Sequence, residues 1–428
     1  MTRRQHTALL LLAIALAATG ASAQTRAGTP ERIYDLGDAM RLIRNDPRLQ
    51  SSEQDVIIAE SRVTEAKLRF LPEVGVQASA SKYNALYPFA LSQDFRSILL
   101  YPEAPQNIFS GRGYFNLPIY EGQRTLNTLR LAQAAHKQAL SNRDSVRMDL
   151  VAQVKDAFYR LLLAQERASA ATENLGALAR ITEDPGLGPW ERIEAESTLA
   201  VARSRTAQAV QDEQSSRLAF LKSLNLELDT SFRVTGSLET VPAKIEVEKA
   251  VLWAMELRPE LQSQTYKAQM DAIGVNLAFS RRYPTLFVAG DYELTDSHFP
   301  LRKNNWDVTI GVKLPLSYDL WSQLKQKRAE QRQGQLARSD LQDRVRLEVR
   351  SSAQSMSYWQ DEVPRRLAQW LRVQSLYDAT RGKPGPALSK LRAHEGLMEL
   401  RLAYLEAVTE HLLARTRLER AIGREIAP

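Results

Sequence analysis

The chain contains no cysteine, and the patterns that most enzyme sites require are missing from it too. Without cysteine there is no disulfide framework, so the stability of the fold must come from packing or from assembly. Five histidines occur in 428 residues, without the spacing of a metal site. Neither a P-loop nor a G-x-S-x-G turn is present. The sequence therefore predicts a protein that is not an enzyme and that carries no cofactor and no metal site.

Long apolar runs are lacking as well, apart from one at the N-terminus. Arg3 and Arg4 precede an apolar run at residues 9–18, and Ala21-Ser22-Ala23 has the small-x-small form of a signal-peptidase site. We expect residues 1–23 to be a signal peptide, with an uncleaved anchor as the alternative. No cysteine follows, so we expect no lipid-anchored N-terminus. Beyond residue 24 no run of about 18 apolar residues predicts a membrane-spanning helix.

A strong excess of charge is also absent. The net charge is +7; the 57 basic residues less the two of the signal peptide are 55, against 50 acidic residues, which leaves +5. The basic residues are interleaved with acidic ones, as on a solvated helical surface. A nucleic-acid footprint would be clustered. The sequence therefore predicts no nucleic-acid partner.

What the chain does have is an internal repeat. Two similar four-residue segments, Asp46-Pro47-Arg48-Leu49 and Arg258-Pro259-Glu260-Leu261, each open a helical stretch. In both copies a second proline, Pro72 or Pro284, precedes a strand-like run, and a later strand-like run ends in Leu-Pro. Repeats must be recognised before a fold is assigned. We expect residues 24–240 and 241–428 to be two copies of a unit made of a helix, a β-hairpin and a long helical hairpin.

The predicted helices are longer than a compact domain needs. They cover residues 126–182, 190–225 and 323–380, with a return helix after Leu388, and Pro-Gly-rich breaks lie at residues 184–189 and 381–386. A helix of about 50 residues is about 75 Å long. Pro364 is expected to kink or split its helix. The return helix carries two apolar stripes, which favour a closed helical palisade over a free antiparallel hairpin.

The predicted strands alternate between apolar and polar residues over about nine positions, the length of a strand in an outer-membrane barrel. An ordinary soluble β layer is the alternative. Two hairpins so far apart in sequence cannot cover their edges within one chain, and lipid tolerates no open edge, so closure would need further copies. The residues predicted to face lipid are Val74, Val76, Leu286, Val288, Trp306, Val308, Ile310 and Val312.

In the order and duplication of these features, the chain resembles the TolC-like outer-membrane efflux proteins. The resemblance implies a mixed, mainly α fold and a homotrimer. Four strands per chain would form a 12-stranded outer-membrane β-barrel, and the antiparallel coiled-coil helices would form a periplasmic α-barrel. It also implies a periplasmic adaptor (membrane fusion protein) and an inner-membrane pump of the RND or ABC type. The protein would be the passive exit duct of a tripartite efflux or type I secretion system, in the outer membrane of a Gram-negative bacterium.

The resemblance further implies that the two helix turns close the periplasmic mouth and contact the adaptor. The corresponding residues are Glu183, Asp184, Gly186, Leu187, Gly188, Trp190, Glu191 and Glu194 in the first copy and Arg381, Gly382, Lys383 and Leu388 in the second. No aspartate occurs around Ser389 and Arg392, which argues against an acidic ring from this half. Arg381 is expected either to latch onto a carboxylate of the neighbouring hairpin or to be a solvated tip residue.

Two questions stay open at the level of sequence. A soluble periplasmic coiled-coil scaffold or adaptor is the alternative function, although the alternating runs and the duplication count against it. The cargo, whether drug, metal cation or protein, is not encoded in any motif, and histidine or methionine clusters for metals are lacking. Residues 84–109 look like a long outward loop.

Overall fold

The computed structural model describes residues 32–82, 107–240, 242–315, 318–380 and 385–426. The predicted signal peptide, most of the predicted loop at 84–109, and Arg381, Gly382 and Lys383 lie outside the described residues. In the part of the chain that is described, none of the helices combines the length and the apolar character that crossing a membrane requires.

One order of elements occurs twice, as the repeat predicts. The first half contains α3 (Pro47–Leu68), β2 (Glu73–Lys82), β3 (Asn107–Tyr120), α5 (Arg124–Thr182) and α6 (Pro189–Ser223). The second contains α8 (Pro259–Ser280), β5 (Thr285–Asp296), β6 (Lys303–Lys313), α9 (Leu320–Thr380) and α10 (Ala387–Ile422). Shorter elements precede α3 and α8: β1 (Arg32–Tyr34), α2 (Leu36–Leu42), a 3-10 turn (Ile43–Asn45), β4 (Phe232–Val234) and α7 (Val247–Leu257). The mainly helical, duplicated fold is confirmed.

Local chemistry explains where α3 begins, and packing explains why α9 is so long. Asp46 caps α3 by accepting a hydrogen bond from the backbone N–H of Arg48 (2.8 Å). The 61 residues of α9 continue through Pro364, so the expected split there is wrong. Val363 is buried against α10, and the Arg366 guanidinium donates to the Ala403 carbonyl of α10 (3.0 Å). These contacts support the continuous helix at the position where proline removes a backbone hydrogen bond.

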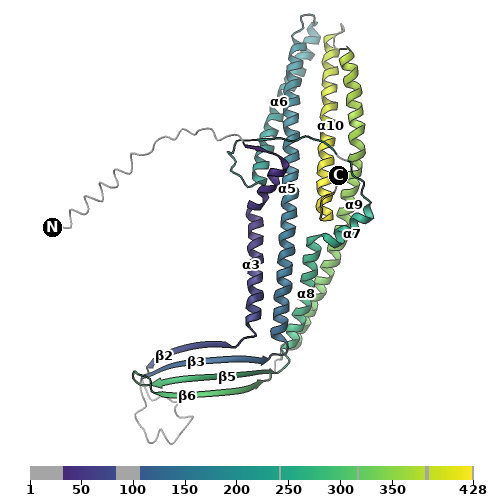
Figure 1. The fold of residues 1–428 in the computed structure, drawn as a ribbon. Helices are drawn as coiled ribbons and strands as arrows, with labels where there is room; N and C mark the ends of the chain where they lie inside the picture. Colours follow the sequence, from purple (N-terminus) through teal and green to yellow (C-terminus); the bar gives the residue numbers. More distant parts are fainter. Residues whose placement is uncertain (1–31, 83–106, 241, 316–317, 381–384, 427–428) are drawn as a thin grey trace, which may run out of the picture.

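The helices stand side by side as a wall, with the sheet across one end (Figure 1). Along the wall, α3 and α6 pack on α5, α5 packs on α8 and α10, and these pack on α9. The α5–α6 and α9–α10 hairpins extend away from the sheet to a common far end. The wall therefore has two lateral edges, α9 on one side and α3 with α6 on the other.

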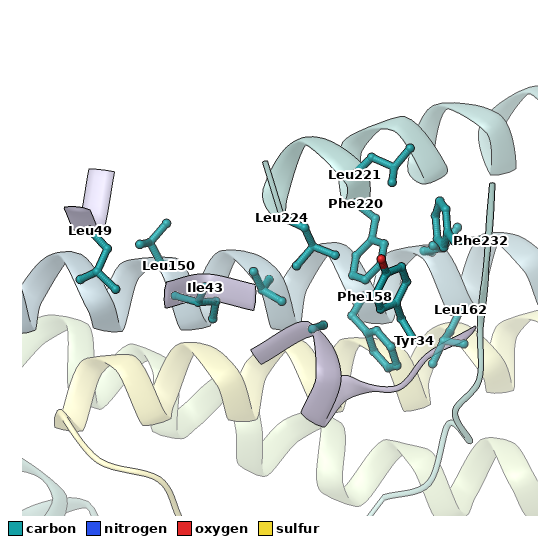
Figure 2. Packing of buried hydrophobic residues seen from close by; sticks show 13 residues of the cluster. Tyr34, Ile43, Leu49, Leu150, Phe158, Leu162, Phe220, Leu221, Leu224 and Phe232 are labelled. Atoms are coloured by element: carbon teal, nitrogen blue, oxygen red, sulfur yellow. The ribbon is translucent and has the colours of Figure 1, made fainter. Parts of the chain in front are cut away.

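An aromatic cluster fixes the short N-terminal elements to the middle of the wall (Figure 2). The rings of Phe158 on α5 and Phe220 on α6 lie 5.9 Å apart, and Phe220 lies 5.6 Å from Phe232 on β4. The ring of Tyr34 on β1 lies 6.0 Å from that of Phe232, and β1 pairs with β4 in parallel. Burial of each such side chain contributes about 1.5–3 kcal/mol.

Ion pairs tie the helices together where α10 ends beside the start of α8. Arg258, whose side chain is 4% exposed, contacts Glu260 (2.5 Å) and Glu348 of α9 (2.7 Å). Arg420 of α10 contacts Glu348 (3.0 Å) and Asp149 of α5 (2.6 Å). Removing one partner of such a group would leave a buried charge uncompensated. Four helices are thereby held at one level of the wall.

All four long strands form one antiparallel sheet in the order β2-β3-β5-β6. The central pair, β3 and β5, comes from different halves of the chain, with Gly113 opposite Tyr292. The two hairpins are therefore joined within one subunit (Figure 1). Within the described residues, β2 and β6 each pair on one side only, which leaves two edges with unpaired backbone groups.

Candidate functional site

The register of the sheet brings the predicted lipid-facing residues onto one face. Val74 lies opposite Phe115, and Phe115 lies opposite Gly290. Directly opposite residues of antiparallel strands share a face, so these rows extend the apolar face across all four strands. Its other members include Val76, Leu286, Val288, Trp306, Val308, Ile310 and Val312. Val76 is 88% exposed and Ile310 is 77% exposed, so nothing in the described chain covers this face.

The opposite face of the sheet is polar. The Arg112 guanidinium of β3 contacts the Asp291 carboxylate of β5 at 2.7 Å. Ser79 and Ser110 form a hydrogen bond between β2 and β3 (2.9 Å). One face suited to lipid and one suited to water is the pattern of a strand in the wall of a membrane barrel.

Aromatic rings lying across glycines hold the strands in this register. The pairs are Tyr114 over Gly75, Phe115 over Gly290 and Phe287 over Gly311, one in each neighbouring strand pair. A Cβ atom on Gly290 would come within 2.7 Å of the Phe115 ring, so a larger residue would displace the ring. Such pairs fix which residues of two strands face each other.

At the far end of the wall, the tips of the two helical hairpins share an apolar cluster. Leu391 of α10 is 1% exposed and belongs to a cluster with Leu178 and Leu199 of the first hairpin. Leu187, in the first turn, is also buried there. Leu388, which the sequence placed at this tip, is only half-buried. Leu391, nearly one helical turn further along, is the residue that joins the tips.

A ladder of ion pairs connects α10 to the first hairpin, beginning at the tip. The Arg392 guanidinium of α10 donates two hydrogen bonds to Oε1 of Glu194 on α6, the one from Nε at 3.1 Å. The Arg392 and Glu194 side chains are 65% and 41% exposed, so this pair is accessible to solvent. Further pairs along the ladder are Arg205 with Glu399, Glu173 with Arg401, and Arg167 with Glu406.

The other acidic residues predicted for the mouth have local roles or lie exposed. Asp184 accepts a hydrogen bond from the Gly186 N–H (3.0 Å), which closes the turn. Glu191 accepts one from the Gly188 N–H (3.0 Å), which stabilises the start of α6. Glu183 is exposed at the end of α5.

The sequence predicts Arg381 as the candidate latch, whereas the residue that forms the ion pair in the structure is Arg392. A signal for Arg392 did exist. Glu194 is the sixth residue of α6 and Arg392 is the sixth residue of α10, because these helices begin at Pro189 and Ala387. The two residues therefore occupy the same position in the two repeats and have opposite charges.

The described residues contain no group of three or more His, Cys, Asp or Glu side chains placed to hold a metal ion. His411 of α10 is 1% exposed, and burial, together with the nearby Arg415 charge, lowers its pKa. It is therefore a neutral part of the helix packing.

Comparisons of the sequence with known proteins found one matching family and one similar protein. The family model for outer membrane efflux proteins matches residues 40–183. The cobalt-zinc-cadmium resistance protein CzcC of Cupriavidus metallidurans is 25% identical over 330 residues, which are 72% of this chain and 76% of that protein.

Solved structures agree with the observed fold. The CmeC outer membrane channel of Campylobacter jejuni matches with a TM-score of 0.79 and 14% identity, over 91% of this chain and 85% of that one. The outer membrane protein VceC of Vibrio cholerae matches with a TM-score of 0.75 and 13% identity, over 92% and 97%. At this identity the matches establish the fold, and the expected TolC-like architecture of the chain is confirmed.

Proposed function

We propose that this chain is an outer membrane efflux protein and that three copies of it assemble into the exit duct of a tripartite efflux system. It is a channel protein of the Gram-negative outer membrane that extends into the periplasm, and it is not an enzyme. The observation that carries the proposal is the sheet, whose faces are divided into apolar and polar and whose two edges are open.

Closure by further copies follows from those edges. In lipid every backbone N–H and C=O group needs a partner, and an open sheet edge leaves a row of them without one. Joining β6 of one copy to β2 of the next satisfies both edges at once. Three copies of four strands make the 12-stranded barrel, with the apolar face toward lipid and the polar face toward the lumen.

The lateral edges of the helical wall support the same assembly. Leu336, Leu347 and Tyr358 recur every 11 residues along α9 and are 60%, 69% and 55% exposed. Eleven residues are three helical turns, so these side chains form one nearly straight stripe. On the opposite edge, Ile57 and Ile58 of α3 are about half exposed. We propose that α9 of one copy packs on the α3–α6 edge of the next, which buries both surfaces.

The hairpin tips form the periplasmic mouth in this proposal. Opening separates the second hairpin from the first, which breaks the Glu194–Arg392 pair and exposes Leu391. Trp190 and Ile193, which are 83% and 61% exposed beside the first turn, are the apolar contacts offered to a periplasmic adaptor. The inner-membrane pump supplies the energy, because transport through the duct is passive.

Cargo selection is assigned to the pump. The relative CzcC is named for resistance to cobalt, zinc and cadmium, which makes metal cations one candidate cargo. The described residues offer no cluster for holding such ions, so the duct itself does not select them. A soluble scaffold is disfavoured because it would leave the apolar sheet face in water.

We also propose that the first of the two repeats ends near residue 240 and that the second begins there.

Cross-linking between β2 and β6 tests the closure. The chain has no cysteine, so only introduced thiols react. The double variant Gln77→Cys/Thr309→Cys places one thiol on each edge strand, both on the polar face. We expect it to give a covalent trimer when outer membranes are treated with a flexible bismaleimide. Gel electrophoresis of the denatured protein measures the product.

The matched control is Ser79→Cys/Ser110→Cys, whose positions are opposite each other within one sheet. This variant is expected to cross-link within the chain and to run as a monomer. If Gln77→Cys/Thr309→Cys also gives only monomers, edge-to-edge closure of the barrel is wrong.

A further inference from the structure

A cavity of about 590 Å³ lies in the corner where the sheet meets the helices. The residues that matter for its chemistry are Arg124, Arg281, Lys313, Phe287, Tyr283 and Pro118. The cavity has the size of a small-molecule pocket, and it combines apolar walls with a few charged groups, as ligand sites do. All of these residues belong to one chain.

The walls of the cavity are fixed by close packing of two turns. Gly122, in the turn between β3 and α5, has a φ of +61°, a conformation that other residues adopt only with strain. A Cβ atom there would lie 2.6 Å from Cβ of Tyr283 and 2.9 Å from the Ser280 carbonyl oxygen. The turn between α8 and β5 is thereby pressed against Gly122. Phe287 lies across Gly311 on the neighbouring strand and forms an apolar side of the cavity.

The charges around the cavity are predominantly positive. Arg124, Arg281 and Lys313 line it and form no ion pair with any of the described residues. The Arg281 guanidinium donates to the neutral Gln323 side chain (Nη1 to Oε1, 2.6 Å), whose amide nitrogen in turn donates to the Asp319 carboxylate outside the cavity lining. Glu121, the acidic residue of the lining, accepts a hydrogen bond from Thr125 (2.5 Å). Three cationic side chains and one carboxylate give the cavity a net positive charge, which favours binding of an anionic ligand.

We propose that this cavity binds amphipathic organic anions, with the anionic group between Arg124, Arg281 and Lys313 and the apolar body against Phe287. Arginine recognises planar or tetrahedral oxyanions through several N–H donors, and aromatic rings add stacking. In the channel, anionic cargo would bind to this cavity transiently during transport.

Its place on the sheet identifies the source of the ligand. Thr285 and Lys313 are opposite each other and, like Phe287, belong to the polar face, whereas the lining residue Leu286 belongs to the apolar face. The ligand therefore comes from the lumen and not from the bilayer; this clause rests on the proposed function, since it takes the polar face as lumenal. The residues that carry the proposal all belong to one chain.

The test is isothermal titration calorimetry of the full-length protein in phosphatidylcholine nanodiscs. The probe is naphthalene-2-sulfonate, and naphthalene-2-sulfonamide has the same ring without the charge. We expect the sulfonate to bind at least about tenfold more tightly, because only the charged sulfonate accepts charge-assisted hydrogen bonds from the cationic side chains. Arg124→Gln/Arg281→Gln should weaken the sulfonate at least about tenfold and leave the sulfonamide unchanged.

Arg282→Gln is the matched control. Arg282 adjoins Arg281 but stacks on Phe279 (5.2 Å) and does not line the cavity, so its loss should leave binding unchanged. Lys313→Gln gives a second, independent loss of charge if the double variant does not fold. Equal affinity for sulfonate and sulfonamide, or unchanged sulfonate binding in both cavity variants, overturns the proposal.

Two competitors identify the source of the ligand. Neither inorganic phosphate nor phosphatidylglycerol in the disc should displace the sulfonate. Displacement by phosphate would reduce the cavity to a simple anion site, and displacement by phosphatidylglycerol would make it a lipid site; either result overturns the proposal of lumenal amphipathic anions. A protein that binds the sulfonate as predicted but is not a trimer contradicts the proposed function and leaves the anion site standing.

Discussion

Replacing Arg392 with alanine is expected to shift the protein toward its open state and to raise its average conductance in planar bilayers. The pair with Glu194 is exposed, and exposed ion pairs contribute about 0.2–1 kcal/mol each. In the proposed trimer, three copies that open together lose three pairs, or about 0.6–3 kcal/mol in total. The ratio of open to closed states should therefore rise by about threefold to about a hundredfold.

The matched control for this variant is Arg346→Ala. Arg346 pairs with Asp343 on the same helix (2.8 Å) and, among the described residues, forms no ion pair with the other hairpin, so its loss should not change the conductance. Glu194→Gln should reproduce the effect of Arg392→Ala, and the double variant should add little to either one. If Arg392→Ala conducts like the wild-type protein, the Glu194–Arg392 pair does not restrain the mouth.

Replacing Ile310 with arginine is expected to abolish stable insertion into the outer membrane. Ile310 is 77% exposed on the apolar face, and an arginine facing lipid near the middle of the membrane costs about 2–4 kcal/mol per copy. A trimer bears this cost three times. Immunoblotting of fractionated membranes should show the variant depleted from the outer membrane and degraded or retained in the periplasm.

Thr309→Arg provides the comparison, because Thr309 is the preceding residue and belongs to the polar face. This variant adds the same charge to the same strand and should still insert as a trimer. Equal insertion of the two variants would mean that the apolar face does not meet lipid.

The repeat made most of the fold predictable, because each helix and hairpin is encoded in its own stretch of sequence. The prediction was poorest at β3. In the sequence, apolar and polar residues alternate only over residues 114–119, whereas the strand spans Asn107–Tyr120. Gly111 and Gly113 have little strand preference of their own. Pairing with β2 on one side and β5 on the other imposes the extended backbone there.

The contact between the hairpin tips was not predictable in the same way. Glu194 and Arg392 are 198 residues apart, and their meeting depends on how two long hairpins lie against each other. Apolar periodicity reports which face of a helix is buried but not which residue of another helix it meets. The anion cavity was missed for the same reason, since Arg124, Arg281 and Lys313 come from three separate elements.

The most direct test of the central claim is to purify the wild-type protein from outer membranes, determine its oligomeric state and record single-channel currents in a planar bilayer. The proposed duct predicts a trimer with a small, fluctuating conductance, because the tips restrain the mouth. A monomer in the periplasmic fraction that forms no pores would contradict the duct and would establish the soluble scaffold in its place.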